Sequence, residues 1–332
     1  MAPQFLCKIL LVWPRSKRLM SLAIVPLAII GLALSSVSFA ATVTNTTDSR
    51  PGTLFDFDGD GRADISVFHQ PYGVWYLNGS TLGVSAVQLG LCSDQITPAD
   101  FDGDGKTDVG VFRDGVWYWI NSSTGRSQAA HFGLAGDIAH AFDYTGDGRA
   151  DLTVYRAGVW HTLDLVNDRS ESTQFGIRTD TPVPADYDGD GRVDYAVYRA
   201  GVWYLLQSAG GFSAIQFGLL TDKPLPADYD GDGKADIAVY RPSDGTWYLQ
   251  RGQPGFTGIP FGLESDVPVP ADYDGDGITD IALFRPANRF WYQLRSSTGF
   301  NAVQFGANGS NWPIRTEFIS SGISDGAGCW AY

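Results

Sequence analysis

The chain has 332 residues and a formal net charge of −14, and 44% of its residues are hydrophobic, with 13% aromatic. The acidic balance argues against nucleic acid as a partner, because nucleic-acid binding relies on basic side chains. Three cysteines are present, and the aromatic content is enough for a substantial core.

The first forty residues are predicted to be a signal peptide. Four basic residues precede an apolar run over residues 19–34, and Ser38-Phe39-Ala40 fits signal-peptidase cleavage after Ala40. We therefore expect a secreted, periplasmic or cell-surface protein with no membrane span after cleavage. An uncleaved membrane anchor is the alternative.

Beyond the leader, one nine-residue phrase recurs six times with the pattern D-x-D-G-D-G-x-x-D. The copies begin at intervals of 44, 43, 43, 42 and 44 residues, at Asp56, Asp100, Asp143, Asp186, Asp228 and Asp272. Carboxylates at positions 1, 3, 5 and 9 can surround one hard cation, glycines at positions 4 and 6 let the backbone bend inward, and the carbonyl of position 7 can complete the shell. The phrase therefore predicts bound Ca²⁺, with five to six ions in all.

The predicted calcium ligands are the carboxylates of each copy and the backbone carbonyl of its seventh residue (Arg62, Lys106, Arg149, Arg192, Lys234 or Ile278). In chain order the ligands are Asp56, Asp58, Asp60, Arg62 and Asp64; Asp100, Asp102, Asp104, Lys106 and Asp108; Asp143, Asp147, Arg149 and Asp151; Asp186, Asp188, Asp190, Arg192 and Asp194; Asp228, Asp230, Asp232, Lys234 and Asp236; Asp272, Asp274, Asp276, Ile278 and Asp280. The third copy carries Thr145 at position 3, so we expect its site to be the weakest. An EF-hand would need a glutamate at position 12, where these copies are apolar, so each loop is expected to lead into a strand.

The residues around each loop also repeat, and they indicate four short strands per copy. In the fifth copy these are predicted at 225–229, 236–240, 246–250 and 258–262, from β-branched and aromatic residues separated by Gly, Pro and Asp. A period in the low forties is typical of a propeller blade or a solenoid unit. We therefore expect an all-β propeller of four-stranded antiparallel blades, forming a single domain over residues 41–332 with repeats that start near 50, 94, 137, 180, 222 and 266.

The number of blades is open between seven and six. A third-strand tryptophan recurs at Trp75, Trp117, Trp160, Trp203, Trp247 and Trp291, and once more at Trp330. The segment NWPIRTEF (311–318) matches the first strand DVPVPADY (266–273), so residues 307–332 are interpreted as a degenerate seventh repeat that residues 42–47 complete. Seven blades are the preferred prediction, and six blades with a loose tail are the alternative.

The D-x-D-G-D-G-x-x-D loops, together with Phe-Gly pairs such as Phe132-Gly133 and Phe175-Gly176, resemble the FG-GAP or VCBS repeat family. This family includes the calcium-binding blades of integrin α-subunits, and the resemblance covers residues 50–318. It implies a seven-bladed propeller with its calcium loops between the first and second strands, on the face opposite the usual ligand surface. The Gly-Ala-Pro element that would follow the Phe-Gly pair is absent, so the resemblance implies fold and metal rather than a particular ligand.

Two cysteines remain after the leader, Cys92 before the second blade and Cys329 in the tail. In an exported protein they can pair, which would fasten the closing blade to the start of the ring. Two unlinked thiols are the alternative.

A second repeated pair consists of an arginine after the second strand and an aspartate before the first strand. The arginines are Arg113, Arg156, Arg199, Arg241 and Arg285, and the aspartates are Asp94, Asp137, Asp180, Asp222 and Asp266. Strand alternation predicts that both lie on one face, opposite the calcium loops. With the repeated tryptophan they could form sugar pockets, but the preferred interpretation is an ion pair that locks each blade over a buried tryptophan.

No catalytic constellation is evident, because the four histidines occupy unrelated repeat positions and neither HExxH nor GxSxG occurs. The sequence therefore predicts an exported, calcium-binding propeller that acts as a monomeric, non-catalytic binding or adhesion module for a protein or cell-surface ligand. A lectin with one site per blade is the alternative, and a secreted hydrolase is the third possibility.

Overall fold

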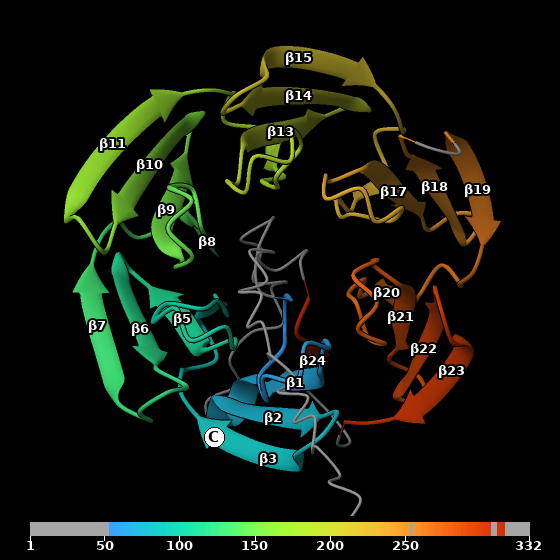
Figure 1. Ribbon diagram of the computed structural model, residues 1–332, viewed down its shortest axis with the longest axis horizontal. Coiled ribbons are helices and arrows are strands. Elements are labelled where there is room, and N and C mark those ends of the chain that lie inside the picture. The colour runs from blue at the N-terminus through green and yellow to red at the C-terminus, as the bar shows by residue number, and fades with distance from the viewer. Residues whose placement is uncertain (1–52, 253–254, 307–310, 316–332) are drawn as a thin grey trace, which may run out of the picture. The chain divides into compact units, whose positions relative to one another are not determined.

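The computed structural model describes residues 53–252, 255–306 and 311–315, which belong to one compact unit beginning at Ser49. Six four-stranded antiparallel sheets stand around a ring in these residues (Figure 1), as an all-β propeller requires. A single turn of 3-10 helix, η1 (Gln70–Tyr72), is the one helical element among them. The predicted fold class is confirmed.

Each blade runs from an innermost to an outermost strand, and the innermost strand has two or three residues in every blade except blade 3, where it has five. Blade 1 consists of β24 (Asn311–Pro313), β1 (Ile65–His69), β2 (Val74–Gly79) and β3 (Gly83–Gln88); blade 2 of β4 (Gln95–Ile96), β5 (Val109–Arg113), β6 (Val116–Ile120) and β7 (Ser127–His131); blade 3 of β8 (Ile138–Phe142), β9 (Asp151–Arg156), β10 (Val159–Asp164) and β11 (Arg169–Gln174); blade 4 of β12 (Thr181–Pro182), β13 (Tyr195–Arg199), β14 (Val202–Gln207) and β15 (Gly211–Gln216); blade 5 of β16 (Lys223–Pro224), β17 (Ile237–Arg241), β18 (Thr246–Gln250) and β19 (Phe256–Pro260); blade 6 of β20 (Val267–Pro268), β21 (Ile281–Arg285), β22 (Phe290–Arg295) and β23 (Gly299–Gln304).

Three strands of blade 5 agree with their predicted positions to within two residues, but the innermost strand, predicted at 225–229, is the two-residue β16 at Lys223–Pro224. Pro226 has no N–H to donate and interrupts the ladder there. Pairing resumes at an isolated bridge between Ala227 and Asp236. The bridge between Ala227 and Asp236 therefore fixes both ends of the acidic loop.

Burial follows the order of the strands in each blade. The second strand is buried on both faces, the third alternates, and the outermost is mostly exposed, as β17, β18 and β19 illustrate. The third-strand tryptophans are at most 1% exposed. Each indole N–H donates to a carbonyl just after the outermost strand, at 2.8–3.3 Å, so the core between blades is also tied to the outer rim.

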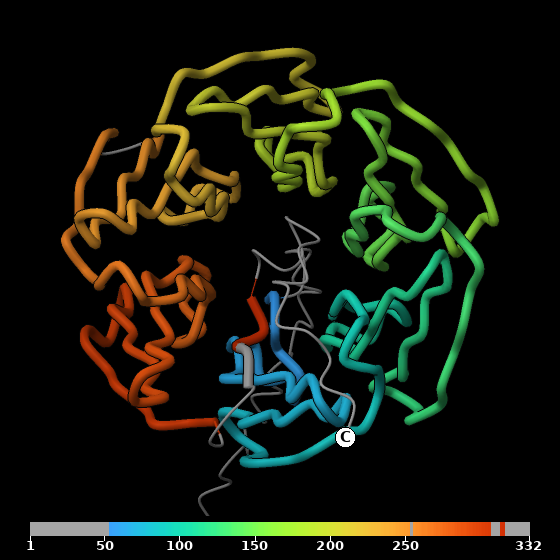
Figure 2. The backbone as a smooth tube through the Cα atoms, turned by 180° about the vertical axis from the view of Figure 1, so that it is seen from behind, coloured from blue at the N-terminus to red at the C-terminus, as the bar shows by residue number. Residues whose placement is uncertain are grey.

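The preferred prediction of seven blades is wrong. The C-terminal strand β24 does not start a new blade but pairs antiparallel with β1, with Val67 opposite Pro313. It thereby supplies the innermost strand of blade 1, and Figure 2 shows this C-terminal segment beside the first strands of the chain. Blade 1 has an acidic loop but no innermost strand of its own among the described residues, and the C-terminal strand β24 supplies the missing strand. Six blades result, and residues 42–47 and Trp330 lie outside the described residues.

The described residues contain no helix long and apolar enough to cross a membrane. The predicted leader, residues 1–40, lies outside them. Cys92 is disulfide-bonded, whereas Cys329 is not among the described residues, so the pairing of these two cysteines stays a prediction.

Candidate metal centres

The six acidic loops, named loops 1 to 6 in chain order, each lead into the second strand of blades 1 to 6; in blades 2 to 6 they follow the innermost strand, and in blade 1 the loop precedes β1. Backbone amides hold both ends of each loop. In loop 1, Asp56 Oδ1 accepts from the Gly59 amide at 2.6 Å and Asp56 Oδ2 from the Gly61 amide at 2.8 Å. Asp64 Oδ2 accepts from the Phe57 amide at 2.9 Å. The carboxylates at positions 1 and 9 are therefore oriented before any ion arrives.

In four loops, one carboxylate oxygen of the position-3 aspartate accepts hydrogen bonds and the other has no hydrogen-bond partner. Asp58 Oδ2 accepts from the backbone amides of Thr81 and Leu82, both at 2.9 Å, in the turn between β2 and β3. The other oxygen, Oδ1, is buried and has no hydrogen-bond partner, and the same holds for Asp102, Asp188 and Asp274. A buried carboxylate oxygen without a donor is costly, and a cation at this point would remove that cost.

Clusters of three aspartates form in five of the loops. In each cluster the three residues offer oxygens that all lie within 4.8 Å of one another: Asp56, Asp58 and Asp64; Asp100, Asp102 and Asp108; Asp186, Asp188 and Asp194; Asp228, Asp230 and Asp236; Asp272, Asp274 and Asp276. Hard oxygen ligands at such spacing suit Ca²⁺. Loop 3 forms no cluster of this kind among the described residues.

Most position-5 aspartates do not join these clusters. They are exposed, and Asp60 Oδ2 accepts instead from the hydroxyls of Ser80 and Thr81. Asp276 is the exception, since it belongs to the loop 6 cluster in place of Asp280. The carbonyl ligands predicted at position 7 remain predictions.

Burial of the position-9 carboxylates shifts their pKa upward. The pKa rises to about 6 for Asp64, Asp108, Asp194, Asp236 and Asp280, and to about 7 for Asp151. Desolvation is the largest cause, and the negative charges of neighbouring loop aspartates add to it. A bound cation would favour the charged form again, so these groups have the chemistry of metal ligands.

Serine residues that the sequence analysis missed support the clusters from the turn after the third strand. In blades 1, 2, 4 and 6 the backbone amide of this serine donates to the position-9 carboxylate, at 2.6–2.8 Å. The serines are Ser80, Ser122, Ser208 and Ser296. Their recurrence after the third strand was a usable signal in the sequence.

Loop 3 has a threonine, Thr145, in place of the position-3 aspartate, and a different aspartate holds the turn after the third strand of blade 3. Thr145 donates its backbone amide to Asp143 Oδ1 at 3.1 Å, and its side chain cannot hold the turn between β10 and β11 as a position-3 aspartate does. Asp164, at the end of β10, holds this turn instead. Its Oδ1 accepts hydrogen bonds from the amides of Val166 and Asn167 at 2.8 and 2.9 Å. That the site of loop 3 is the weakest stays a prediction.

Blade 3 also carries buried polar residues on three of its strands. His140, Thr153 and Thr162 are at most 3% exposed. The hydroxyls of Thr153 and Thr162 lie 2.9 Å apart, and Thr162 is also 2.9 Å from the Tyr195 hydroxyl. The two threonines and Tyr195, which lies on β13 of blade 4, therefore form a hydrogen-bonded group between blades 3 and 4.

Neighbouring loops are joined directly to each other. The position-8 amide of every loop donates to the position-1 carbonyl of the preceding loop at 2.6–2.8 Å, including Ala63 of loop 1 to Asp272 of loop 6. The position-7 side chain of each loop also lies over the position-4 glycine of the preceding one, as Arg149 does over Gly103. All six loops therefore form one closed hydrogen-bonded ring.

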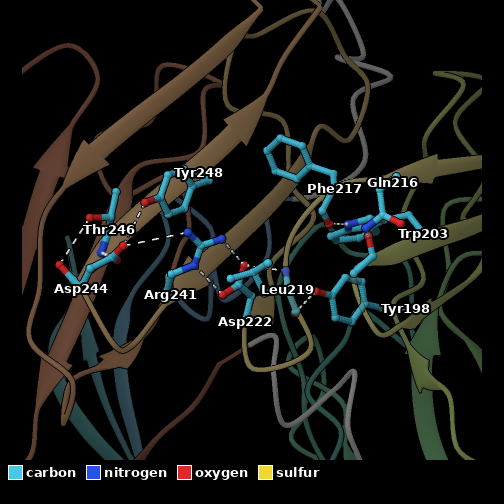
Figure 3. Close-up of polar contacts among 11 residues, drawn as sticks. Tyr198, Trp203, Gln216, Phe217, Leu219, Asp222, Arg241, Asp244, Thr246 and Tyr248 are labelled. Carbon is cyan, nitrogen blue, oxygen red and sulfur yellow. Dashed lines mark hydrogen bonds and ion pairs between the residues drawn. The ribbon is translucent and has the colours of Figure 1, made fainter.

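At the opposite ends of the second strands, the predicted arginine–aspartate pairs are formed in blades 2 to 6. Figure 3 shows the pair of blade 5, in which Arg241 donates to both oxygens of Asp222 at 2.9 and 2.8 Å. The Tyr248 ring lies over this guanidinium, with its centroid 4.3 Å from Arg241 Cζ. The preferred interpretation of an ion pair that locks each blade agrees with this geometry.

The sequence profile of the FG-GAP-like repeat matches residues 56–111 and 228–283. Each stretch begins on position 1 of one loop, Asp56 or Asp228, and ends in the strand after the following loop. The chain is a β-propeller that carries FG-GAP-like repeats. No curated protein matches the sequence of this FG-GAP propeller.

Solved structures similar to the FG-GAP propeller include a lectin from Agrocybe aegerita that recognises non-reducing terminal N-acetylglucosamine. The two share 17% identity over 74% of this chain and 77% of the lectin, with a TM-score of 0.52. A streptogramin B lyase shares 7% identity over 78% of this chain and 85% of the lyase, with a TM-score of 0.50. Identities this low show the fold alone, and the same fold serves binding and catalysis.

Proposed function

We propose that this protein is an exported, calcium-stabilised propeller that works as a non-catalytic binding or adhesion module. The observation that carries the calcium part is the buried, donor-free Oδ1 of the position-3 aspartate in four loops. The position-3 aspartate belongs to a cluster of carboxylates. Backbone amides orient the other carboxylates of this cluster, as in loop 1. Calcium would supply charge neutralisation there and link the loop to the following hairpin.

The residues fit calcium better than a softer metal. The clusters consist of aspartate oxygens alone, and hard cations prefer such ligands, while zinc and copper sites draw on histidine or cysteine. At a free calcium concentration ten times the dissociation constant, each site would add about 1.4 kcal/mol to the free energy of unfolding.

The test is thermal unfolding of residues 41–332 with calcium and with excess chelator, combined with ion counting by equilibrium dialysis. Support requires bound calcium and a clear fall in melting temperature under chelator. Unchanged melting together with no bound calcium would refute the proposal. Magnesium at the same concentration is the matched control ion, since it demands a tighter octahedral site.

The binding role rests on the FG-GAP repeats and on the rigid face that carries the arginine–aspartate pairs. A protein or cell-surface ligand on this face is the proposed partner. A lectin is the second candidate, favoured only by the similarity of fold to the Agrocybe aegerita lectin. The third-strand tryptophans are at most 1% exposed, so a sugar would have to stack on other aromatic rings. A glycan array probed with the calcium-loaded protein would separate the two candidates.

A secreted hydrolase is the least supported function. The aspartate clusters that could act as paired acids and bases are committed to loop geometry and to the proposed ions. A catalytic role for the buried polar residues of blade 3 would require access of substrate to them, and His140 is 0% exposed.

A further inference from the structure

One of the five arginine–aspartate pairs lacks the aromatic cover that the others have. In blades 2, 4, 5 and 6 a tyrosine ring lies over the arginine, with ring centroids 4.3–5.3 Å from the guanidinium carbon. The pairs are Arg113 with Tyr118, Arg199 with Tyr204, Arg241 with Tyr248, and Arg285 with Tyr292. In blade 3, no ring among the described residues covers Arg156 in this way.

His161 stands where the tyrosine would be. It pairs with Val154 across β9 and β10, as Tyr204 pairs with Val197 in blade 4. The imidazole is smaller than a phenol ring, and its Nδ1 lies 2.7 Å from the hydroxyl of Ser172 on the outermost strand. The pKa of His161 is lowered by burial and by the positive charge of Arg156, which favours the neutral ring. The tyrosine ring that lies over the arginine in four other blades is thus absent from blade 3.

A pocket of about 260 Å³ lies at this point. Arg156 and His161 form its polar side, while Phe132, Leu134 and Val154 supply apolar walls. The Leu134 side chain is 57% exposed, so the pocket can be reached from solvent. The Arg156 side chain is 38% exposed, more than any of the other four paired arginines.

The guanidinium of Arg156 belongs to the lining of this pocket and is paired with Asp137. Asp137 engages its Nε and Nη2 edge, which leaves the faces of the plane available. In the other four blades the same ion pair coexists with a stacked phenol ring, so the pairing does not prevent an aromatic contact. A desolvated cation–aromatic contact of this kind is favourable, and the apolar walls would exclude water from the ring edge.

We propose that this pocket binds an aromatic ring of a ligand, stacked on Arg156 in place of the missing tyrosine. The shared chemistry is a planar phenyl or phenol group, from either a free small molecule or a tyrosine side chain of a partner polypeptide. The inference deepens the proposed binding role and rests on it, but it does not depend on the calcium loops.

The experiment titrates p-cresol into residues 41–332 at saturating calcium, with binding followed by saturation-transfer NMR. Folding of every sample is checked by its melting curve, so that loss of the pocket is distinguished from loss of the calcium-stabilised fold. We expect one saturable site. We also expect 4-methylcyclohexanol, which has a similar shape without the π face, to bind at least tenfold more weakly.

Two matched variants make the test sharp. His161→Tyr installs the residue that four other blades carry and should weaken p-cresol binding at least tenfold. Tyr204→His should open a second pocket of the same kind over Arg199 and raise the number of sites from one to two. Unchanged p-cresol binding in His161→Tyr, equal binding of the cyclohexanol, or saturable binding of N-acetylglucosamine but not of p-cresol would overturn the proposal.

The source of the ring is settled by competition. Displacement of p-cresol by the peptide Gly-Tyr-Gly, but not by Gly-Leu-Gly, supports a polypeptide partner. Binding of p-cresol that neither peptide displaces supports a free aromatic molecule.

Discussion

The backbone amide of Ala63 donates to the carbonyl oxygen of Asp272 at 2.7 Å, which joins the first acidic loop to the sixth. Five equivalent bonds connect the other neighbouring loops. The ring of loops is therefore closed through six members, without a gap for a further blade. An ion bound in one loop would also stiffen the position-1 residue whose carbonyl holds the next loop.

Calcium counting should give five strong sites. Loops 1, 2, 4, 5 and 6 form aspartate clusters, whereas Thr145 removes a charged ligand from loop 3. We expect equilibrium dialysis to find five tightly bound ions in the native chain and six in Thr145→Asp. Thr145→Asn, which adds no charge, should remain at five. Six tight ions in the native chain would contradict this view of loop 3.

The effect of Asp58→Asn on the free energy of unfolding should have opposite signs with calcium and without it. With calcium present the variant loses one ion and is expected to lose about 1.4 kcal/mol of unfolding free energy at ten times the dissociation constant. Under chelator it should be as stable as the native chain or more so, because a buried carboxylate oxygen with no donor has been neutralised. Asp60→Asn, at an exposed position that hydroxyls satisfy, is the comparison and should have a smaller effect. Equal destabilisation of Asp58→Asn with and without calcium would show a purely structural role.

Gly103→Ala tests the contact between successive loops. Gly103 and Gly105 both have positive φ, at 75° and 84°, so alanine strains either position by about 1–2 kcal/mol. A Cβ at Gly103 would also lie 2.9 Å from Arg149 Nε, whereas one at Gly105 meets nothing within 4 Å. Urea unfolding should show a larger loss for Gly103→Ala, and Arg149→Ala should remove the difference. A difference that persists without the arginine side chain would assign it to backbone strain.

Asp164→Ala should destabilise the protein by about 1–2 kcal/mol to the same extent with calcium and with chelator. Asp164 holds the turn of blade 3 by hydrogen bonds to backbone amides, and loss of these acceptors leaves the amides unpaired. Thermal melts in both conditions provide the measurement. A calcium-dependent loss would mean that Asp164 acts through an ion instead.

His161→Tyr should stabilise the protein, and the gain should grow as the pH falls. The new ring over Arg156 is expected to add about 0.5–1 kcal/mol at neutral pH. Because the pKa of His161 is lowered in the folded state by burial and by Arg156, the unfolded chain takes up the proton first as pH falls through about 6.5. That protonation costs stability in the native chain and not in the variant. Melting temperatures of both proteins from pH 7.5 to 5 should therefore diverge, and parallel curves would exclude this titration.

Much of each blade could be predicted from local pattern. The loop phrase, the apolar second strand and the buried tryptophan each depend on residues close together in the chain, whose side chains report burial and turn geometry directly. The ion pair between Arg241 and Asp222 was also predictable, because strand alternation and a short connection place both residues at one end of the same blade. The role proposed for His161 could not be predicted, because the sequence does not show that a tyrosine lies over the arginine at the same position in four other blades.

The repeat, its strands and the acidic loops with their oxygen ligands could be predicted from the amino-acid sequence alone, since these arise from backbone preferences and charges within some forty residues. The number of blades, in contrast, became evident only from the fold. The segment at 311–315 has the sequence pattern of a first strand. This pattern does not indicate whether the segment begins a seventh sheet or completes the sheet of blade 1. Its pairing with β1 joins segments from the two ends of the described chain, because blade 1 has no innermost strand of its own among the described residues.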